Sequence, residues 1–365
     1  MSEWQTFYLK DLGKIVGGAT PSTNNPKNYG NKIAWITPKD LSTLQGRYIK
    51  KGSHSISRLG FKSCSCVLLP KYAILFSSRA PIGYVAIAEK RLCTNQGFKS
   101  IIPNKKIYFE FLYYLLKYHK DNISNIGGGT TFKEVSGATL GLFKVKIPPT
   151  YYEQQKIART LSILDQKIEN NHKINEILHT LAYKIYEYYF KYKPKNAKLE
   201  QIIIENPKSS IMVKNAQKTQ DKYPFFTSGD NTLSYPKAII DGRNCFLNTG
   251  GNAGIKFYVG KASYSTDTWC ICANEFSDYL YLLLSSIKNH INQSFFQGTS
   301  LKHLQKNLLK KYPIYMPSAH EIKKFNQMIM PLLTLISINT RTSKKLEQIR
   351  DFLLPLLLTQ QVKPQ

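Results

Sequence analysis

The residues best suited to chemistry gather in short glycine-rich loops, and the chemistry they suit is the binding of phosphate. The loop GGGTTFK covers 127–133, a related loop begins GTSLK at 298, and a third, GGATPST, covers 17–23. Backbone N–H groups, hydroxyls and amines in such loops can contact phosphate oxygens. An ordinary surface loop is the alternative at 17–23, whereas recurrence of the other loop favours binding. The candidate phosphate contacts are Thr20, Ser22, Thr130, Lys133, Thr299 and Lys302.

A second group of polar side chains could read the edges of DNA bases. Lys39 and Arg79 stand beside apolar stretches, and Asn95 is followed directly by Gln96. Arg and Lys suit the acceptor atoms of guanine, whereas Asn and Gln suit adenine. Thr227, within the segment PFFTSGD, completes the set of candidate DNA-binding residues.

The same search finds no catalytic or cofactor-binding constellation. The glycines of 250–254 lack the GxGxxG spacing. The run from Gly254 to Lys261 has one residue too many for a phosphate loop, and Ala262 stands where Ser or Thr would bind magnesium. The histidines are scattered, and the acidic residues form no cluster that would suit a two-metal site. We therefore expect a non-catalytic chain without a cofactor or metal of its own. A self-contained nuclease with an unrecognised site is the alternative.

The net charge favours a polyanionic partner. Lys and Arg number 51 against 23 Asp and Glu, a formal charge of +28 that is spread along the whole chain. Basic charge over folded domains suits a nucleic-acid surface, although a Lys-rich proteome would give the same composition. A third hypothesis, a purely structural coiled-coil adaptor, leaves this charge unexplained.

The expected compartment is the cytoplasm. The sequence contains neither a signal-peptide pattern nor a run of 18 apolar residues. The six cysteines include the spaced pairs Cys64/Cys66 and Cys270/Cys272, with no histidine at a zinc-finger spacing. We therefore expect buried free thiols and no disulfide bonds.

The elements that must position these residues occur twice. Gly129, Thr130 and Lys133 match residues in the second half at a constant offset of 169, and Pro148 matches Pro317 at the same offset. After each copy, apolar residues recur at alternating spacings of four and three, which indicates a coiled-coil seam. The first seam runs from Ile157 to Tyr189 and is interrupted by Asn171 and Asn175. The second runs from Phe325 to Leu357 and is interrupted at the equivalent Asn339 and Ser343.

Because the polar interruptions match, the best partner of each helix is the other one. A buried polar residue in a seam fixes register and partner. Two unrelated amphipathic helices, each packed on its own domain, are the alternative. Pro331 removes a backbone donor inside the second pattern, so we expect a kink or a late start there. The outer positions of the first helix, including Tyr186, Tyr188 and Phe190, are expected to be exposed.

Each helix follows a region of mixed composition that is rich in strands. Gly and Pro punctuate short apolar stretches such as Cys66–Leu69 and Ala73–Phe76, and Tyr108–Tyr118 and Asp278–Asn292 each predict a helix. The sequence therefore predicts an α+β protein in which two mixed α/β domains are separated by two long antiparallel coiled-coil helices, with pseudo-two-fold repetition. The expected boundaries are a first domain at 1–150, a first spacer helix at 151–193, a second domain at 194–317 and a second spacer helix at 318–365.

Several motifs together resemble those of the specificity subunits of type I restriction–modification enzymes. The first-half motifs are GGATPSTNNPKNYG at 17–30, WITPKDL at 35–41, RAPIGYVAIA at 79–88, TNQGFKSI at 94–101, GGGTTFKEVS at 127–136 and IPPTYYEQQKI at 147–157. The second half adds PFFTSGD at 224–230 and the repeat. It lacks the WITPKD wording, and STDTW stands at 265–269 where the first half has TNQGF.

The resemblance implies that each globular domain is a target-recognition domain that reads half of a bipartite DNA site. The paired helices would set the distance between the half-sites and dock two methyltransferase subunits, which would use S-adenosylmethionine to modify adenine. Motor-nuclease subunits that use ATP and magnesium would complete the restriction complex. On this interpretation the chain itself binds double-stranded DNA and holds no cofactor.

Overall fold

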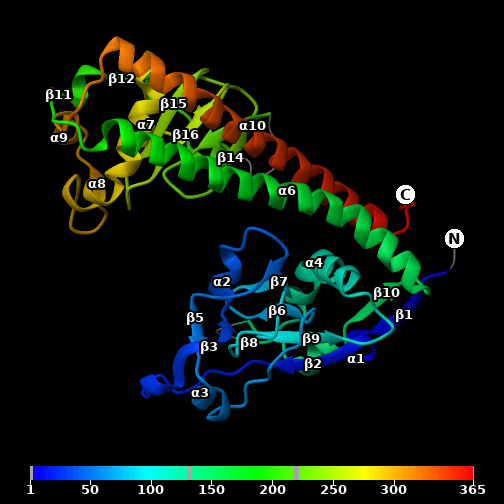
Figure 1. Ribbon diagram of the computed structural model, residues 1–365. Coiled ribbons are helices and arrows are strands. Elements are labelled where there is room, and N and C mark those ends of the chain that lie inside the picture. Colours follow the sequence, from blue (N-terminus) through cyan, green and yellow to red (C-terminus); the bar gives the residue numbers. More distant parts are fainter. Residues whose placement is uncertain (1–2, 130–132, 217–221, 365) are drawn as a thin grey trace. The chain divides into compact units, whose positions relative to one another are not determined.

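The chain forms two compact units, each of which contains one mixed α/β domain and part of two long helices. The computed structural model describes residues 3–129, 133–216 and 222–364 (Figure 1). Unit 1 comprises Met1–Glu169 and Ile349–Gln365, and unit 2 comprises Asn170–Gln348. Within the described ranges, no helix combines the length and apolar character needed to cross a membrane.

The domain of unit 1 (domain 1) contains one large and two smaller sheets. The large sheet has the strand order β2-β9-β6-β7-β4, the second sheet has the order β5-β3-β8, and β1 pairs with β10. The helix α4 (Phe109–Asn125) packs on the large sheet, with Phe111, Leu112 and Leu115 buried in the core. The strands are β1 (Gln5–Tyr8), β2 (Gly13–Gly17), β3 (Tyr29–Ile36), β4 (Tyr48–Ile49), β5 (His54–Ile56), β6 (Ile74–Ser78), β7 (Ile82–Ala88), β8 (Cys93–Thr94), β9 (Lys99–Pro103) and β10 (Lys144–Ile147), and the short helices are α1 (Leu9–Leu12), α2 (Pro38–Ser42), α3 (Arg58–Lys62) and α5 (Gly137–Gly141).

The domain of unit 2 (domain 2) repeats this plan. Its large sheet has the order β12-β18-β15-β16, its second sheet the order β14-β13-β17, and β11 pairs with β21. In the second sheet of each domain, the central strand pairs in parallel with one outer strand. These pairs are β3 with β8 in domain 1 and β13 with β17 in domain 2. The strands are β11 (Ala197–Lys198), β12 (Ile204–Glu205), β13 (Tyr223–Phe226), β14 (Leu233–Tyr235), β15 (Arg243–Asn248), β16 (Ile255–Val259), β17 (Ser263–Tyr264), β18 (Thr268–Cys272), β19 (Phe296–Gln297), β20 (His303–Leu304) and β21 (Pro313–Ile314), and the helices are α7 (Ser277–Ser286), α8 (Lys288–Ser294) and α9 (Lys306–Lys310).

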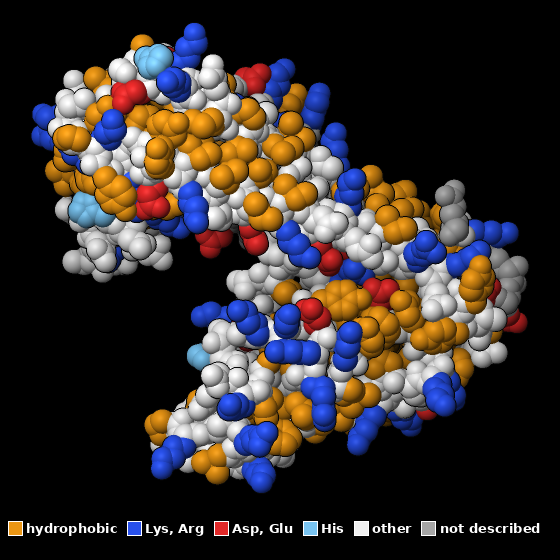
Figure 2. Space-filling model, in the orientation of Figure 1, with side chains coloured by type: hydrophobic (Ala, Val, Ile, Leu, Met, Phe, Trp, Pro, Cys, Tyr) orange, Lys and Arg blue, Asp and Glu red, His pale blue; other side chains and the backbone are white. Residues whose placement is uncertain are grey.

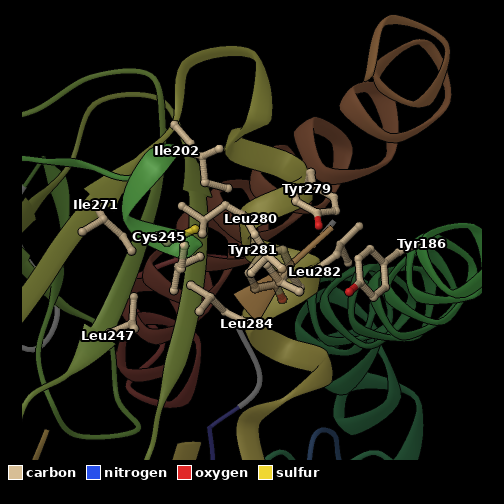
Figure 3. Close-up of a cluster of buried hydrophobic side chains, with 14 of the residues drawn as sticks. Tyr186, Ile202, Cys245, Leu247, Ile271, Tyr279, Leu280, Tyr281, Leu282 and Leu284 are labelled. Carbon is tan, nitrogen blue, oxygen red and sulfur yellow. The ribbon is translucent and has the colours of Figure 1, made fainter. Parts of the chain in front are cut away.

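The core of domain 2 lies between its large sheet and α7. Figure 3 shows Cys245 and Leu247 of β15 facing Leu280 and Leu284 of α7, with Tyr186 beyond α7. All five side chains are at most 2% exposed. Because Tyr186 belongs to the first long helix, that helix is part of the domain core.

The two long helices start with the same capping box. In α6 (Tyr151–Tyr186), Thr150 accepts from the N–H of Glu153 at 3.2 Å and donates its hydroxyl to the Glu153 carboxylate. In α10 (Ala319–Leu358), Ser318 accepts from the N–H of Glu321 at 3.4 Å and donates both its hydroxyl and its own N–H to the Glu321 carboxylate. The hydrogen bonds from Ser318 hold the pKa of Glu321 at about 2. The glutamate shared by the two sequence repeats is therefore a helix-start signal.

The helices pair antiparallel through the polar positions that interrupt their seams. In unit 2, α6 and α10 lie side by side (Figure 1). Asn171 Nδ2 donates to Ser343 Oγ at 3.1 Å, and Asn339 Nδ2 donates to Asn175 Oδ1 at 2.9 Å. Asn171 and Ser343 are both buried. The predicted pairing of one helix with the other is therefore confirmed, down to the match between the polar interruptions.

A buried arginine joins each domain to a long helix. In unit 1, Arg47 binds Glu110 of α4 at 2.9 Å and Glu169 of α6 at 3.1 Å. In unit 2, Arg243 forms a bidentate pair with Asp278 of α7 and donates to Thr334 of α10 at 2.9 Å. The Arg47 side chain is only 3% exposed, so its charge depends on these carboxylates.

Two expectations about the helices were wrong in part. The helix α10 starts at Ala319, well before Pro331, which excludes a late start there, and the alternative of a kink stays a prediction. Pro331 is exposed, and water can bind the carbonyl group that loses its donor there. Tyr186 and Phe190 are buried at 2% and 1% exposure, and only Tyr188 is open. The chain forms a π-helical turn at Glu187–Lys191, and the core of domain 2 covers this end of α6.

The local predictions are confirmed in part. Ala73–Phe76 falls largely in β6 and Tyr108–Tyr118 in α4, but Cys66–Leu69 forms only an isolated bridge at Leu69. Asp278–Asn292 is divided into α7 and α8 at Ile287. All six cysteines are free thiols, four of them buried, as expected.

The polar seam pairs predict a specific stability pattern. Asn171→Leu removes the donor to the buried Ser343 hydroxyl and should lower the free energy of unfolding by about 1–3 kcal/mol. Adding Ser343→Leu should restore most of this loss, because both partners are then apolar. Urea unfolding of the two single variants and the double variant measures the coupling. Strictly additive losses would contradict the pairing.

Candidate DNA interface

The candidate residues of domain 1 come together where several strands end at one edge of the domain (the domain 1 edge). Ala19 N–H donates to Thr94 O at 3.0 Å, and Asn95 N–H donates to Ile36 O at 2.9 Å. Thr20 donates its hydroxyl to the amide oxygen of Gln96. The loop after β2, the turn between β8 and β9 and the end of β3 therefore form one surface.

Gly18 allows this close approach. A Cβ atom at Gly18 would lie 2.0 Å from Asn95 O and 2.4 Å from Thr94 O, and both atoms are backbone. Ala19 O accepts from the Trp35 indole at 3.0 Å, which fixes the residue before Thr20. The segment 17–19 thus serves as a tightly held support, and Thr20 and Ser22 follow it with partly and fully open side chains.

Lys39 lies in the first turn of α2, next to the same surface. The helix is held at its start because Asp40 accepts from Thr37 N–H at 2.7 Å and from Ser53 N–H at 2.7 Å. Burial disfavours the charged carboxylate, but these hydrogen bonds outweigh it and lower the pKa of Asp40. Asp40 therefore fixes the turn while Lys39 projects into solvent.

The glycine-rich loop at 127–133 is fastened to the end of β6. Gly128 and Glu134 exchange backbone hydrogen bonds of 3.1 and 2.9 Å, and Val135 N–H donates to Ser78 O at 3.0 Å. Glu134 also binds Arg79 at 3.5 Å and Lys99 at 3.2 Å. Lys133 is exposed, and Thr130 lies outside the described residues.

Domain 2 builds the equivalent surface (the domain 2 edge) from the equivalent loops. Thr249, at the end of β15, donates its hydroxyl to Asp267 O at 2.7 Å, and Ser228 donates to the same oxygen. Gly251 N–H donates to Lys302 O at 2.9 Å, which joins the β15–β16 loop to the loop that carries Thr299. The side chains of Thr299 and Lys302 are exposed.

Thr227 has a different environment from the other candidates. Its side chain is 6% exposed, and its hydroxyl accepts from Gly229 N–H at 3.1 Å. Its carbonyl oxygen accepts from the amine of Lys256 at 2.6 Å, and burial lowers the pKa of this amine. In this structure Thr227 shapes the turn at the domain 2 edge, so any contact with DNA would be made by its neighbours.

Sequence reasoning missed several residues of the domain 2 edge. Ser228, Thr249, Asp267 and His303 lie in or directly beside the loops that match those of domain 1. Asp267 occupies the turn between β17 and β18, equivalent to the Asn95–Gln96 turn between β8 and β9. The segment STDTW was the available signal, because it stands where the first half has TNQGF.

The charge distribution suits a polyanionic partner. On the face shown in Figure 2, Lys and Arg side chains are scattered over both units and clearly outnumber Asp and Glu. Within the part of the chain that the structure describes, no group of three His, Cys, Asp or Glu side chains is placed to hold a metal ion.

A second surface runs along the long helices and carries exposed apolar side chains, with lysines such as Lys167, Lys184 and Lys345 among them. We call this surface the open flank. Each of its exposed apolar residues directly precedes a seam position in the sequence, so these residues share one side of the helix pair in each unit. The residues that touch the domains, such as Glu169 and Ser337, lie directly after a seam position. The open flank comprises Ile174, Ile177, Leu181, Leu335 and Ile338 in unit 2 and Ile163, Ile349 and Phe352 in unit 1.

Comparisons with known proteins connect both halves to one family. The model of the type I restriction modification DNA specificity domain matches residues 1–179 and again 195–348. A type I restriction enzyme MjaIX specificity subunit from Methanocaldococcus jannaschii is 33% identical, over 98% of this chain and 93% of its own length. A putative MjaX specificity subunit from the same organism is 39% identical over 50% of this chain and 41% of its own length.

The fold agrees with that of a solved structure. A type I restriction–modification S subunit from M. genitalium superimposes with a TM-score of 0.63, over 97% of this chain and 96% of its own, at 17% identity. Each half of the chain thus matches the family model, and the chain matches one relative and one solved structure over nearly its full length. The chain belongs to the specificity subunits of type I restriction–modification systems.

Proposed function

We propose that this chain binds double-stranded DNA through the domain 1 and domain 2 edges, each of which reads one half of a bipartite site. The observation that carries this proposal is that the same set of loops, joined by equivalent hydrogen bonds, recurs at both edges. Two similar readers held by paired helices suit a site with two specified halves and an unspecified gap.

Contacts at each edge divide into those that hold phosphate and those that read bases. Lys133 and Lys302 are exposed in equivalent loops and suit phosphate oxygens. Gln96 lies in the turn between β8 and β9, Lys39 lies in α2, and both side chains are exposed. Gln suits the edge of adenine, and Lys suits the edge of guanine. Arg79 can reach DNA only if it leaves Glu134, which gives that arginine two alternative partners.

The chemistry is assigned to partner subunits in the cytoplasm. Methyltransferase subunits would supply S-adenosylmethionine and modify adenine, and motor-nuclease subunits would use ATP and magnesium. The purified chain alone should neither cleave nor methylate DNA in the presence of magnesium. Cleavage by the chain alone would favour the alternative of a self-contained nuclease.

We assign the docking of methyltransferase subunits to the open flank of the long helices. Ile177 and Phe352 are each 67% exposed, which leaves large apolar side chains in water. Apolar surface of this kind marks a protein interface. The flank recurs on both helices by the same heptad rule, so it offers related surfaces to two copies of one partner.

Binding should depend on salt and on the two equivalent lysines. Lys133→Glu and Lys302→Glu should each weaken binding and make the log–log salt slope shallower by about one, since each removes one phosphate contact. Lys105→Glu is the matched control, because Lys105 is exposed in the turn after β9, at the opposite end of that strand from the domain 1 edge. Fluorescence anisotropy at several salt concentrations measures the slopes. Equal slopes for all variants would mean that these loops are structural.

Charge on the open flank should block assembly. Ile177→Glu should reduce co-purification with the methyltransferase subunit by about tenfold or more, because a carboxylate would be buried in an apolar interface. Leu308→Glu in α9 changes an exposed leucine of domain 2 that is away from the helices, and it should have no effect. Equal assembly of both variants would place the partner elsewhere.

The helix pair should set the gap between the half-sites. The seam from Ile157 to Tyr189 is about 50 Å long at 1.5 Å per residue. Inserting four residues into both helices near Asn171 and Asn339 should lengthen the gap by roughly two base pairs, since about 6 Å is added and each base pair rises about 3.4 Å. Sequencing of methylated DNA from cells that carry the insertion measures the gap. An unchanged gap, or altered half-sites, would contradict this role of the helices.

A further inference from the structure

The two large sheets differ at one edge. In domain 1 the strand β7 is covered by β4, whereas in domain 2 the equivalent strand β16 is the outermost strand among the described residues. The equivalence is fixed by register. Ile87 of β7 and Phe257 of β16 both face the core helix of their domain, and each lies six residues before the parallel strand that follows. In the described part of domain 2, no strand takes the place that β4 has in domain 1.

The main chain of β16 faces the position that β4 occupies in domain 1. In domain 1, Ile87 N–H of β7 donates to Arg47 O at 2.8 Å, and Glu89 N–H donates to Ile49 O of β4 at 3.0 Å. In domain 2, Val259 takes the place of Glu89, and its N–H donates to Ser337 Oγ of α10 at 3.0 Å.

Because Val259 points away from β15, every second residue of β16 does the same. The N–H and C=O groups of Phe257 and Ile255 are thus directed to the outer side of the sheet. The guanidinium group of Arg341 in α10 donates to the carbonyl oxygen of Val259 at 2.9 Å, but it does not reach the main chain of Phe257 or Ile255. Phe257 and Ile255 therefore direct the N–H and C=O groups that could pair with a further strand toward the outer side of the sheet.

A groove of about 860 Å³ lies along this edge, between β16, β13 and α10. Its floor is aromatic, since Phe257 stacks on Tyr281 with ring centroids 4.9 Å apart. Lys222 and Lys261 line it and are exposed, and neither makes an ion pair with a carboxylate in the described part of the chain. Asp230 is the acidic residue of the lining, so the groove carries a net positive charge.

We propose that the groove binds an extended, acidic segment of a partner protein, which adds to β16 as a strand in the position that β4 holds in domain 1. Strand addition to an exposed sheet edge supplies main-chain hydrogen bonds, and flanking pockets supply specificity. The lysines around the groove select for acidic side chains. The proposal is independent of how the domain edges read DNA.

The geometry favours a peptide over a second DNA contact. Each outward-facing residue of β16 presents a donor and an acceptor side by side. A peptide strand satisfies both groups, whereas a phosphodiester backbone carries acceptors and leaves the carbonyl oxygens unpaired. The lysine side chains alone would suit either a peptide or DNA, so the main-chain groups of β16 distinguish between these two ligands.

The test uses the full-length chain and a short labelled peptide in which valine and glutamate alternate, followed by fluorescence anisotropy. Methylating alternate amide nitrogens of the peptide removes the donors that would pair with β16 and leaves the protein untouched. We expect the methylated peptide to bind at least about tenfold more weakly. Equal binding of the two peptides would overturn strand addition.

Charge variants separate the groove from the DNA site. The double change Lys222→Glu with Lys261→Glu should weaken peptide binding about tenfold and leave DNA binding at the level of its control. The control, Lys14→Glu with Lys105→Glu, places the same charge change on exposed positions of domain 1. If the groove variant instead loses DNA affinity beyond the control and binds the peptide normally, the groove holds DNA and the proposal is wrong. DNA binding by the Lys133→Glu and Lys302→Glu variants tests the proposed function separately, whichever result the groove variant gives.

Discussion

The antiparallel pairing of α6 with α10 is the constraint on which the rest of the structure depends. The seam positions of the two helices meet, and the buried Asn171–Ser343 contact fixes their register. The domains then attach to the flank that follows the seam, through Arg47 on Glu169 and Val259 on Ser337. A slip by one residue would turn these anchor positions away from the domains, so register and domain attachment are a single requirement.

Duplication explains how one chain can present two readers. Both domains contain a large sheet, a three-stranded sheet with one parallel pair and a two-stranded sheet, and both precede a helix that starts with a capping box. The scaffold is repeated while the loops differ, for example Asn95–Gln96 in one turn and Asp267 in the other. Side chains at equivalent positions can therefore meet different bases without a change in the scaffold.

The sequence predicted what is periodic and missed what depends on packing. The repeat, the two helices and the match between their polar interruptions follow from spacing alone, and the structure confirms them. Burial of Tyr186 and Phe190 depends on the packing of α7 and α10 against this end of α6, which leaves no local pattern in the sequence. That the described residues of domain 2 contain no equivalent of β4 is likewise a property of the whole sheet. At the candidate site, loop composition indicated Lys133 and Lys302, but Thr249 and Asp267 required the alignment of the strands.

The central claim is that two separate edges of one chain specify two half-sites, and it is tested most directly by sequencing methylated adenines in cells with and without the chain. The account predicts that removal of the chain abolishes methylation at one motif, made of two short specified segments and a gap of fixed length and free sequence. Loss of methylation at a continuous motif, or no change in methylation in cells whose partner subunits are active, would contradict it.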